Sequence, residues 1–270
     1  KKVIGSCETR PATTLDLPDQ MTRDPNESPH DASPASAGEV VNALSFDIED
    51  WFHLVEIDAV SDPEQWSTFP SIVEHRTEEI LDICAQHDAK ATFYFLGWIA
   101  ERYPALVRRV VEAGHEIGTH SYWHRKVCDL DEATFREDLL RSIKVIEDAG
   151  GAKVTSFRAP SFSITPGTEW AFDVLLDAGL RYDASLFPVA RENGGYPCAE
   201  TPHLFTAAPS GRGMPELPMS LMRVGPKRVG FSGGGYLRLF PAWVIHRGFS
   251  ALNRRGIPGV VYLHPRDFAP

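Results

Sequence analysis

The chain has 270 residues and a formal net charge of -10, from 27 Lys and Arg against 37 Asp and Glu. Its hydrophobic fraction of 43% and aromatic fraction of 10% are typical of a globular protein with a sizeable core, in one large domain or two small ones. The negative charge argues against nucleic acid or an acidic polymer as the partner, because long-range repulsion opposes both.

The first part of the chain differs in composition from the rest. Residues 1–40 contain five prolines and many Asp, Ser, Thr and Ala residues, but few large apolar side chains. Such a segment buries too little apolar surface to offset the entropy lost on ordering. We therefore expect an N-terminal tail over residues 1–40 and a folded domain over residues 41–270.

Targeting signals are not seen in this numbering. No apolar run reaches the ~18 residues of a transmembrane helix, and the segment from Lys1 to Ser6 lacks the apolar centre of a signal peptide. The four cysteines are scattered and form no CxxC motif, which favours a reducing compartment.

From residue 40 onward, short apolar strands alternate with amphipathic helices. Strands are expected over residues 40–46, 91–96, 115–119 and 154–158, from residue 181, and over 258–263. Helices are expected over residues 72–86, 103–113, 131–149, 165–178 and 240–255. Residues 190–235 are rich in Gly and Pro and predict loops with short strands. Asp131 and Thr165 are expected to cap their helices, the second with Pro166 at the first helical position.

Polar residues recur where the predicted strands end. The repeating strand–helix order indicates a parallel β/α architecture, either a barrel or a doubly wound sheet. In barrels the chemistry lies at the carboxyl ends of the strands. The residues at or just after such ends are Asp47, His120, Arg158, Asp183 and His264.

A histidine pair follows the strand over residues 115–119. His120 and His124 are four residues apart, and on one helical turn such a pair converges on a single divalent ion. The segment from Asp47 to Asp50 adds carboxylates, one as a ligand and one left over as a base. Two histidines and one carboxylate leave open metal positions, as a hydrolytic site requires.

Five short motifs, in this order, resemble those of the polysaccharide deacetylases, the chitooligosaccharide-deacetylase superfamily of metal-dependent carbohydrate esterases. They are Phe46–Asp50, His120–His124, Phe157–Phe162, Tyr182–Ser185 and Leu263–Pro265. The resemblance covers residues 43–270. The Asp-Ile-Glu-Asp-Trp-Phe-His run and the later Gly233–Arg238 segment look most like an exopolysaccharide-associated branch, similar to the allantoinase-like and peptidoglycan-deacetylase-like group.

The resemblance implies an α/β fold, a distorted (β/α)7 barrel of the polysaccharide deacetylase type, with residues 41–270 as the catalytic domain. It implies that His120 and His124 bind Zn²⁺, or alternatively Co²⁺ or Ni²⁺, with a carboxylate as third ligand. Asp47 would be the base and either Glu49 or Asp50 the ligand. Strand alternation favours Glu49, which shares a face with Asp47, whereas a turn would let Asp50 converge instead.

The resemblance also implies the remaining catalytic roles. Arg158 would pair with Asp47 and keep it ionised. His264 would protonate the leaving amine, and a nearby carboxylate would raise its pKa. Asp183 and Asp267 are the candidates for this carboxylate, and the motif position favours Asp183.

Other residues near the motifs are expected to bind the substrate. A backbone N–H near Ser161 would stabilise the oxyanion together with the metal. The apolar slot for the acetyl methyl group would be formed by Trp51, Phe162, Leu186 and Leu263.

The expected function is metal-dependent hydrolysis of the N-acetyl amide of an N-acetylhexosamine in a bacterial polysaccharide or its precursor, releasing acetate, in the cytoplasm or periplasm. The expected partner is an N-acetylated oligo- or polysaccharide, without nucleic acid. Two alternatives are a C–N hydrolase of a small cyclic amide or ureide and a non-catalytic glycan-binding remnant. An intact set of His120, His124 and His264 argues against loss of the metal.

Overall fold

The computed structural model describes residues 40–54, 57–60, 62–191 and 194–269. The tail expected over residues 1–40 lies outside the described residues, except for residue 40. From Gly38 onward the chain forms a single compact unit. Among the described helices, none combines the length and apolar character needed to cross a bilayer.

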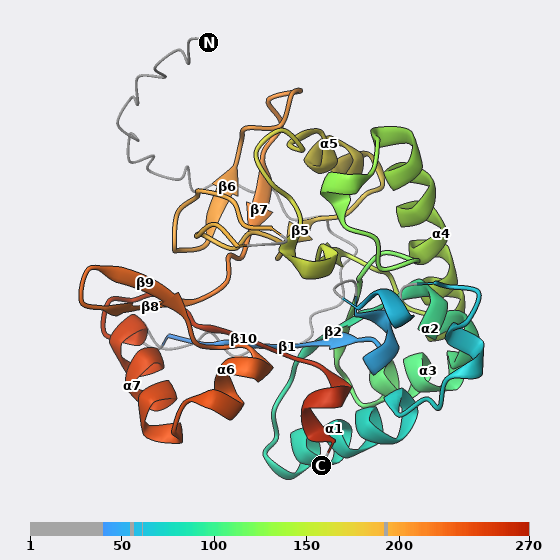
Figure 1. Ribbon diagram of the computed structural model, residues 1–270, viewed down its shortest axis with the longest axis horizontal. Coiled ribbons are helices and arrows are strands. Elements are labelled where there is room, and N and C mark those ends of the chain that lie inside the picture. Colours follow the sequence, from blue (N-terminus) through green and yellow to red (C-terminus); the bar gives the residue numbers. More distant parts are fainter. Residues whose placement is uncertain (1–39, 55–56, 61, 192–193, 270) are drawn as a thin grey trace, which may run out of the picture. The chain divides into compact units, whose positions relative to one another are not determined.

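The unit is built around one curled sheet (Figure 1). Seven strands run parallel in the order β10-β1-β2-β3-β4-β5-β7, and β6 pairs antiparallel with β7 at one edge. No described strand joins β6 back to β10, so the sheet forms an open, distorted barrel, which confirms the expected fold class. The strands are β1 (Ala43–Ile48), β2 (Thr92–Phe95), β3 (Glu116–Thr119), β4 (Ser156–Phe157), β5 (Tyr182–Asp183), β6 (His203–Phe205), β7 (Met214–Glu216) and β10 (Val260–Leu263).

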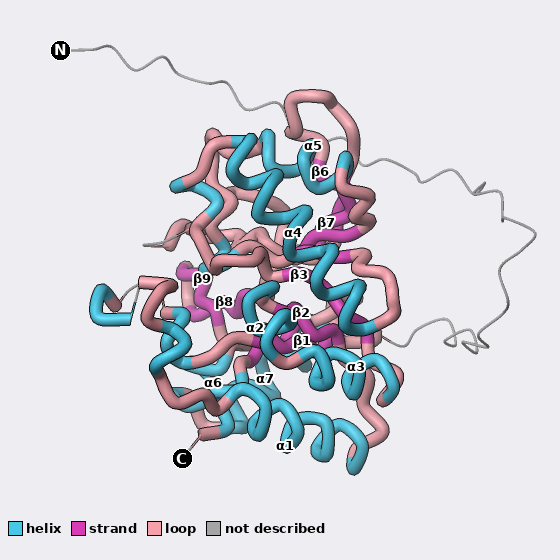
Figure 2. The backbone as a smooth tube through the Cα atoms, turned by 90° about the vertical axis from the view of Figure 1, so that its right-hand side faces the viewer, coloured by secondary structure: helices cyan, strands magenta, loops and turns pink. Residues whose placement is uncertain are grey.

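Five helices cover the convex side of the sheet, as Figure 2 shows for the first four, which lie in front of the strands. They bury a continuous apolar core against it, in which Leu106 and Leu139 meet Phe93 and Phe157. The helices are α1 (Val73–Gln86), α2 (Gly97–Arg102), α3 (Pro104–Glu112), α4 (Glu132–Gly150) and α5 (Trp170–Asp177). Between β7 and β10 the chain adds the hairpin β8 (Leu221–Val224) and β9 (Lys227–Gly230), then α6 (Gly234–Leu239) and α7 (Ala242–Asn253).

The concave side of the sheet is polar, and strand alternation explains why. In β1, Phe46 and Ile48 pack into the core beneath the helices, whereas Ser45 and Asp47 point to the other face. On that face Tyr94 of β2 lies over Gly118 of β3, where an added Cβ would stand 2.5 Å from the tyrosine ring. Gly118 thus lets the ring reach the centre of the sheet.

Two predicted helices differ from the structure. The helix expected over residues 165–178 begins only at Trp170, because the Thr168 hydroxyl accepts the Thr165 N–H and donates to the Thr165 carbonyl in a separate turn, so Thr165 does not cap α5. The helix expected over residues 240–255 begins only at Ala242, since Phe240 precedes Pro241 and is extended, and the separate helix α6 before it was not expected. The cap predicted at Asp131 is confirmed, because its carboxylate accepts the N–H of Thr134 at 2.7 Å.

Replacing Asp131 by alanine should lower the free energy of unfolding by about 1 kcal/mol, because the first turn of α4 loses its side-chain acceptor. Urea denaturation of the two proteins measures the difference. Asp148→Ala near the other end of α4 is the matched control and should change stability by less than ~0.5 kcal/mol. Equal losses in both variants would contradict the capping role.

Candidate active site

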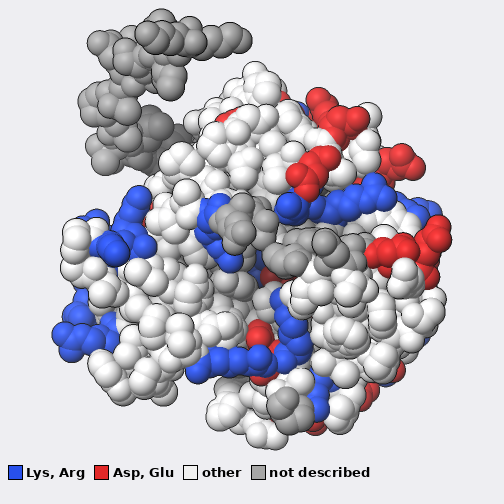
Figure 3. All heavy atoms as spheres, viewed as in Figure 1, with Lys and Arg blue, Asp and Glu red and all other residues white. Residues whose placement is uncertain are grey.

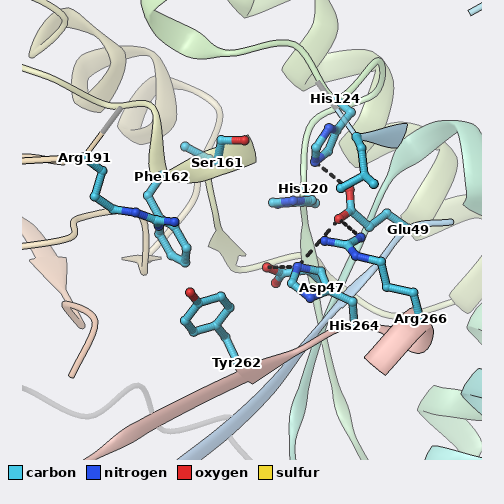
Figure 4. A pocket seen from close by; sticks show the side chains of 12 residues that line it. Asp47, Glu49, His120, His124, Ser161, Phe162, Arg191, Tyr262, His264 and Arg266 are labelled. Carbon is cyan, nitrogen blue, oxygen red and sulfur yellow. Dashed lines mark hydrogen bonds and ion pairs between the residues drawn. The ribbon is translucent and has the colours of Figure 1, made fainter. Parts of the chain in front are cut away.

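Polar side chains from the carboxyl ends of several strands meet in one cavity (Figure 4). The cavity measures about 280 Å³. In Figure 4, Glu49 lies between His124 and Arg266, with Asp47 and His264 beside it. The described lining residues are Asp47, Glu49, Leu54, His120, His124, Ala159, Ser161, Phe162, Arg191, Tyr262, His264 and Arg266.

The two histidines converge through a loop and not through the helical turn that their spacing allows. Ser121 and His124 adopt left-handed backbone conformations, with φ of 65° and 54°. Such conformations are costly for residues other than glycine, so the surroundings must hold them. Buried Asp138 of α4 does so, because its carboxylate accepts the backbone N–H groups of Tyr122 at 2.8 Å and Trp123 at 3.0 Å.

Glu49, His120 and His124 form a cluster suited to a divalent ion, since one ligand atom from each lies within 4.8 Å of the others. Nδ1 of His120 lies 2.7 Å from the carbonyl oxygen of Arg158. A carbonyl only accepts, so Nδ1 carries the hydrogen and Nε2 keeps its lone pair for a metal. Burial lowers the pKa of His120 to about 4, although Asp47 raises it, so the imidazole is neutral.

The carboxylate of this cluster is ionised and paired through both oxygens. Oε2 of Glu49 lies 2.6 Å from Nε2 of His124, and Oε1 accepts from Nη1 of Arg266 at 2.5 Å. Burial raises the pKa of Glu49, but the charges of His124 and Arg266 outweigh it and hold the pKa well below its ordinary value. Two imidazoles and one carboxylate are a donor set that Zn²⁺ uses in hydrolytic sites, so the residues present fit such an ion.

Asp50, the other candidate ligand, turns away from this cluster. Its carboxylate accepts the backbone N–H groups of Trp51 at 3.0 Å and Ile72 at 3.2 Å, and the hydroxyl of Ser71 at 2.5 Å. It therefore ties the end of β1 to the start of α1. The geometry favours Glu49 as the third ligand, in line with strand alternation.

Asp47 and Arg158 form a buried ion pair beside the cluster, with Nη1 and Oδ1 2.8 Å apart. The same Nη1 donates to the hydroxyl of Ser45 at 2.9 Å, and the guanidinium lies 4.3 Å from the centre of the Tyr94 ring. Burial raises the pKa of Asp47, but Arg158, with His120 and His264, outweighs it and holds the pKa below its ordinary value. Asp47 is thus ionised and fixed in position.

His264 is oriented by Asp267 and not by Asp183, which corrects the preference drawn from motif position. Nδ1 of His264 lies 3.1 Å from the Asp267 carboxylate, and its Nε2 lies 3.8 Å from Asp47. The 3-10 turn Pro265–Phe268 places Asp267 there, because its carboxylate also accepts the His264 N–H at 2.9 Å. A local turn thus supplies the partner.

Asp183 instead belongs to a pair of buried carboxyl groups. It lies opposite Glu216 of β7 and accepts the hydroxyl of Ser185 at 2.7 Å, while Glu216 accepts the N–H of Leu186 at 3.0 Å. Burial and the charge of Asp183 raise the pKa of Glu216 well above its ordinary value, and burial raises that of Asp183. Glu216 therefore holds a proton next to Asp183.

Only part of the predicted substrate slot lies at the cavity. Ser161 and Phe162 line it, with left-handed φ angles of 54° and 55°. Trp51, Leu186 and Leu263 do not line it. Trp51 packs against Phe52 and Phe69, and its indole N–H donates to the carbonyl of Pro70. Leu186 is fully buried in the main core, and Leu263 packs against that core.

Sequence reasoning missed several lining residues, namely Leu54, Ala159, Arg191, Tyr262 and Arg266. Three of them were within reach of the motifs, since Ala159 lies inside the Phe157–Phe162 motif. Tyr262 lies two residues before His264 on the same strand face, and Arg266 lies two residues after it. Arg191 comes from the long loop region after β5, for which the sequence carried no signal.

A second cavity of about 450 Å³ shares Leu54 and His124 with the first. Its aromatic walls come from Phe52, Trp66 and Trp123. His53 also lines it, and its Nδ1 accepts the Asp50 N–H at 2.8 Å, so Nε2 carries the hydrogen. No described residue forms a hydrogen bond with that buried Nε2, and burial lowers the pKa of His53 to about 3. The imidazole is therefore a neutral donor.

Two family models match the chain. The model described as polysaccharide deacetylase matches residues 58–182, and a domain of unknown function (DUF3473) matches residues 184–270. His120, His124 and Arg158 fall within the first match and His264 within the second, whereas Asp47 and Glu49 precede both.

Curated relatives match part of the chain. A peptidoglycan-N-acetylglucosamine deacetylase of Bacillus cereus is 34% identical over 84 residues, which is 31% of this chain and 30% of that protein. A chitooligosaccharide deacetylase of Sinorhizobium fredii is 34% identical over 100 residues, or 37% of this chain and 44% of that protein. The chain thus spans less than half the length of either relative.

Solved structures share the fold over most of the chain. A Mycobacterium smegmatis protein assigned to the polysaccharide deacetylases aligns with a TM-score of 0.64 at 21% identity, covering 86% of this chain and 80% of that one. Puue allantoinase aligns with a TM-score of 0.61 at 19% identity, covering 89% and 82%. At such identities the likeness shows a common fold.

Substitutions of the adjacent carboxylates Glu49 and Asp50 distinguish the metal ligand from the side chain that accepts backbone N–H groups. Glu49→Gln should weaken Zn²⁺ binding at least ~100-fold, because a neutral amide replaces an ionised ligand. Asp50→Ala should leave Zn²⁺ affinity within ~3-fold but lower the free energy of unfolding by about 1–3 kcal/mol, because buried N–H groups lose their acceptor. Zinc titration and urea denaturation measure the two effects. The reverse pattern would make Asp50 the ligand.

The Asp183–Glu216 pair should make stability depend on pH. The folded-state pKa of Glu216 is raised, so its contribution is complete below the unfolded pKa and is lost as pH rises through the folded value. Glu216→Gln imitates the protonated form and should flatten the fall in unfolding free energy as pH rises above the ordinary pKa of a glutamate. Urea denaturation at several pH values above that pKa measures it. An unchanged slope would mean that Glu216 ionises normally.

Proposed function

Because the chain belongs to the polysaccharide deacetylase superfamily, we propose that it removes acetyl groups from N-acetylhexosamine units of a bacterial polysaccharide or its precursor, with residues 41–270 as the catalytic domain. One observation carries the proposal. A metal-suited cluster (Glu49, His120 and His124), an ionised Asp47 and a histidine held by Asp267 face a single cavity.

Glu49, His120 and His124 would hold a divalent ion, Zn²⁺ by donor chemistry. When bound, such an ion supplies polarisation of the acetyl carbonyl and lowers the pKa of a water molecule. Co²⁺ and Ni²⁺ suit the same donors, because imidazole and carboxylate accept several first-row ions.

Asp47 acts as the general base and takes a proton from the attacking water. Its depressed pKa keeps it ionised, and the ion pair with Arg158 leaves Oδ2 facing His264 at 3.8 Å. Arg158 is a positioning residue in this account. It also fixes His120, through its own backbone carbonyl.

His264 acts as the general acid. Asp267 holds Nδ1, so Nε2 faces Asp47 and Glu49 at the cavity. Nε2 delivers a proton to the departing amine as the carbon–nitrogen bond breaks, which yields a free amino sugar and acetate. Asp183 has no direct part in this transfer, because it is engaged with Ser185 and faces Glu216.

The substrate contacts follow from the cavity walls. Phe162 and Tyr262 pack edge to face at 4.9 Å between ring centres and offer an apolar surface for the acetyl methyl group. The backbone at Ser161 would face the oxyanion. The second cavity, with aromatic walls and the His53 donor, shares Leu54 and His124 with the first and favours a glycan longer than one sugar.

Asp47→Asn and His264→Gln should each lower kcat for acetate release from N-acetylglucosamine oligomers by about 10²–10⁴-fold, because each removes a proton-transfer group. Bound metal per chain should stay the same in Asp47→Asn. The comparison uses purified protein loaded with Zn²⁺, and circular dichroism checks the fold of each variant.

The test also separates the alternatives. Lys144→Gln, far from the cavity on exposed α4, is the control and should retain full activity. Hydrolysis of allantoin or another cyclic ureide, without acetate release from the oligomers, would favour the cyclic-amide hydrolase. Glycan binding by a folded, metal-loaded protein that hydrolyses neither substrate would indicate a non-catalytic binding module.

A further inference from the structure

Charge is unevenly distributed along this acidic chain. Between Glu216 and Asp267 the sequence contains no Asp or Glu, although the whole chain carries a net charge of -10. The same stretch, up to the end of α7 and the turn after it, carries Arg223, Lys227, Arg228, Arg238, Arg247, Arg254 and Arg255. Figure 3 shows blue side chains on the side where β8, β9 and α7 lie in Figure 1.

Helix α7 separates its faces sharply. Ile245, Gly248 and Leu252 are buried against the body of the protein. On the outer side, Trp243, Arg247 and Ala251 are spaced four residues apart, so they form one exposed stripe, and Arg255 in the turn after the helix lines the same groove. Trp243 is 68% exposed, which is unusual for the largest side chain in proteins.

The β8–β9 hairpin continues this stripe. A groove of about 400 Å³ runs between α7 and β8, and Arg223, Val224, Trp243, Arg247 and Arg255 are among its lining residues. Val224 is 54% exposed, and Leu239 at the end of α6 is 72% exposed. Large apolar side chains and cations therefore alternate over one surface, which we call the α7 face.

Most cations of this region have no ionic partner. Arg228 pairs with Glu200 at 3.1 Å, and Arg238 lies 3.8 Å from Asp267. The others form no ion pair with any described residue, and they are Arg223, Lys227, Arg247, Arg254 and Arg255. A surface of uncompensated cations attracts an anionic partner.

We propose that the α7 face docks on an anionic phospholipid bilayer. Clustered Lys and Arg side chains are attracted to anionic headgroups, and tryptophan favours the boundary between headgroups and acyl chains. Helix α7, lying in the membrane plane with the exposed Trp243 beside Arg247, meets both requirements. The enzyme would then act at a membrane surface.

Charge and exposure favour this occupant over the others. A second copy docked through the same face would set its cations against their equivalents, because a twofold contact pairs each patch with itself. A soluble polyanion would neutralise the arginines but leave Trp243, Leu239 and Val224 in water. A bilayer accommodates both kinds of side chain.

Co-sedimentation with vesicles tests the proposal on the full chain. Binding should be strong to vesicles of equal parts phosphatidylglycerol and phosphatidylcholine, weak to pure phosphatidylcholine, and reduced by salt. Arg247→Gln/Arg255→Gln should lower the partition coefficient roughly 30-fold, at about fivefold per cation. Trp243→Ser should lower it roughly tenfold.

A matched pair removes the same charge elsewhere. Arg108→Gln/Arg181→Gln changes two exposed cations of α3 and of the segment before β5 and should alter binding less than ~2-fold. All variants should keep the wild-type melting temperature and acetate release from a soluble oligomer, since none touches the cavity. If neither the wild-type protein nor any variant released acetate, the result would contradict the proposed function, and the vesicle-binding results would still test docking.

Four results would overturn docking on lipid. The first is equal binding to neutral and anionic vesicles. The second is an equal loss of vesicle binding in Arg108→Gln/Arg181→Gln, which would show that binding depends on the net charge of the protein and not on the α7 face. The third is binding to a soluble polyanion such as heparin that depends on Arg247 and Arg255 but not on Trp243, which would identify a polyanion site. A concentration-dependent dimer abolished by Trp243→Ser would likewise replace the bilayer with a second copy.

Discussion

The buried ion pair of Arg158 and Asp47 is the constraint on which the rest of the site depends. Arg158 is 1% exposed, so its charge is tolerable only because Asp47, Ser45 and the Ala184 carbonyl receive its N–H groups. Its backbone carbonyl also fixes the tautomer of His120. One residue at the end of β4 thus positions the proposed base from β1 and a proposed ligand after β3.

Around this pair, burial gives chemically identical carboxyl groups different states. Asp47 and Glu49 are held ionised by neighbouring cations, whereas Glu216 keeps its proton because its nearest charged neighbour is another carboxylate. Asp50 and Asp138 accept backbone N–H groups and hold the segments that carry the ligands. The hydrogen-bond donors and charges around each carboxyl group therefore determine whether it is ionised, protonated or bound to backbone N–H groups.

Short-range patterns in the sequence predicted much of this, and long-range contacts account for the rest. Alternation in β1 favoured Glu49, which lies beside His120 and His124, but only the approach of Ser71 and Ile72, some twenty residues on, explains why Asp50 turns away. Motif position favoured Asp183 as the partner of His264, while the 3-10 turn Pro265–Phe268 places Asp267 there. Trp51 was assigned to the substrate slot by proximity in sequence and lies against Phe69 instead. The net charge of -10 gave no indication of the cationic α7 face, because a total charge does not show where along the chain the charged residues lie.

The central claim is that Glu49, His120 and His124 share one catalytic ion. Anomalous diffraction from crystals grown with Zn²⁺ tests it most directly. The account predicts a single strong peak about 2.0–2.2 Å from Nε2 of both histidines and from a Glu49 carboxylate oxygen, with at least one open position toward the cavity. No peak at this cluster, or a peak ligated by Asp50 in place of Glu49, would contradict it.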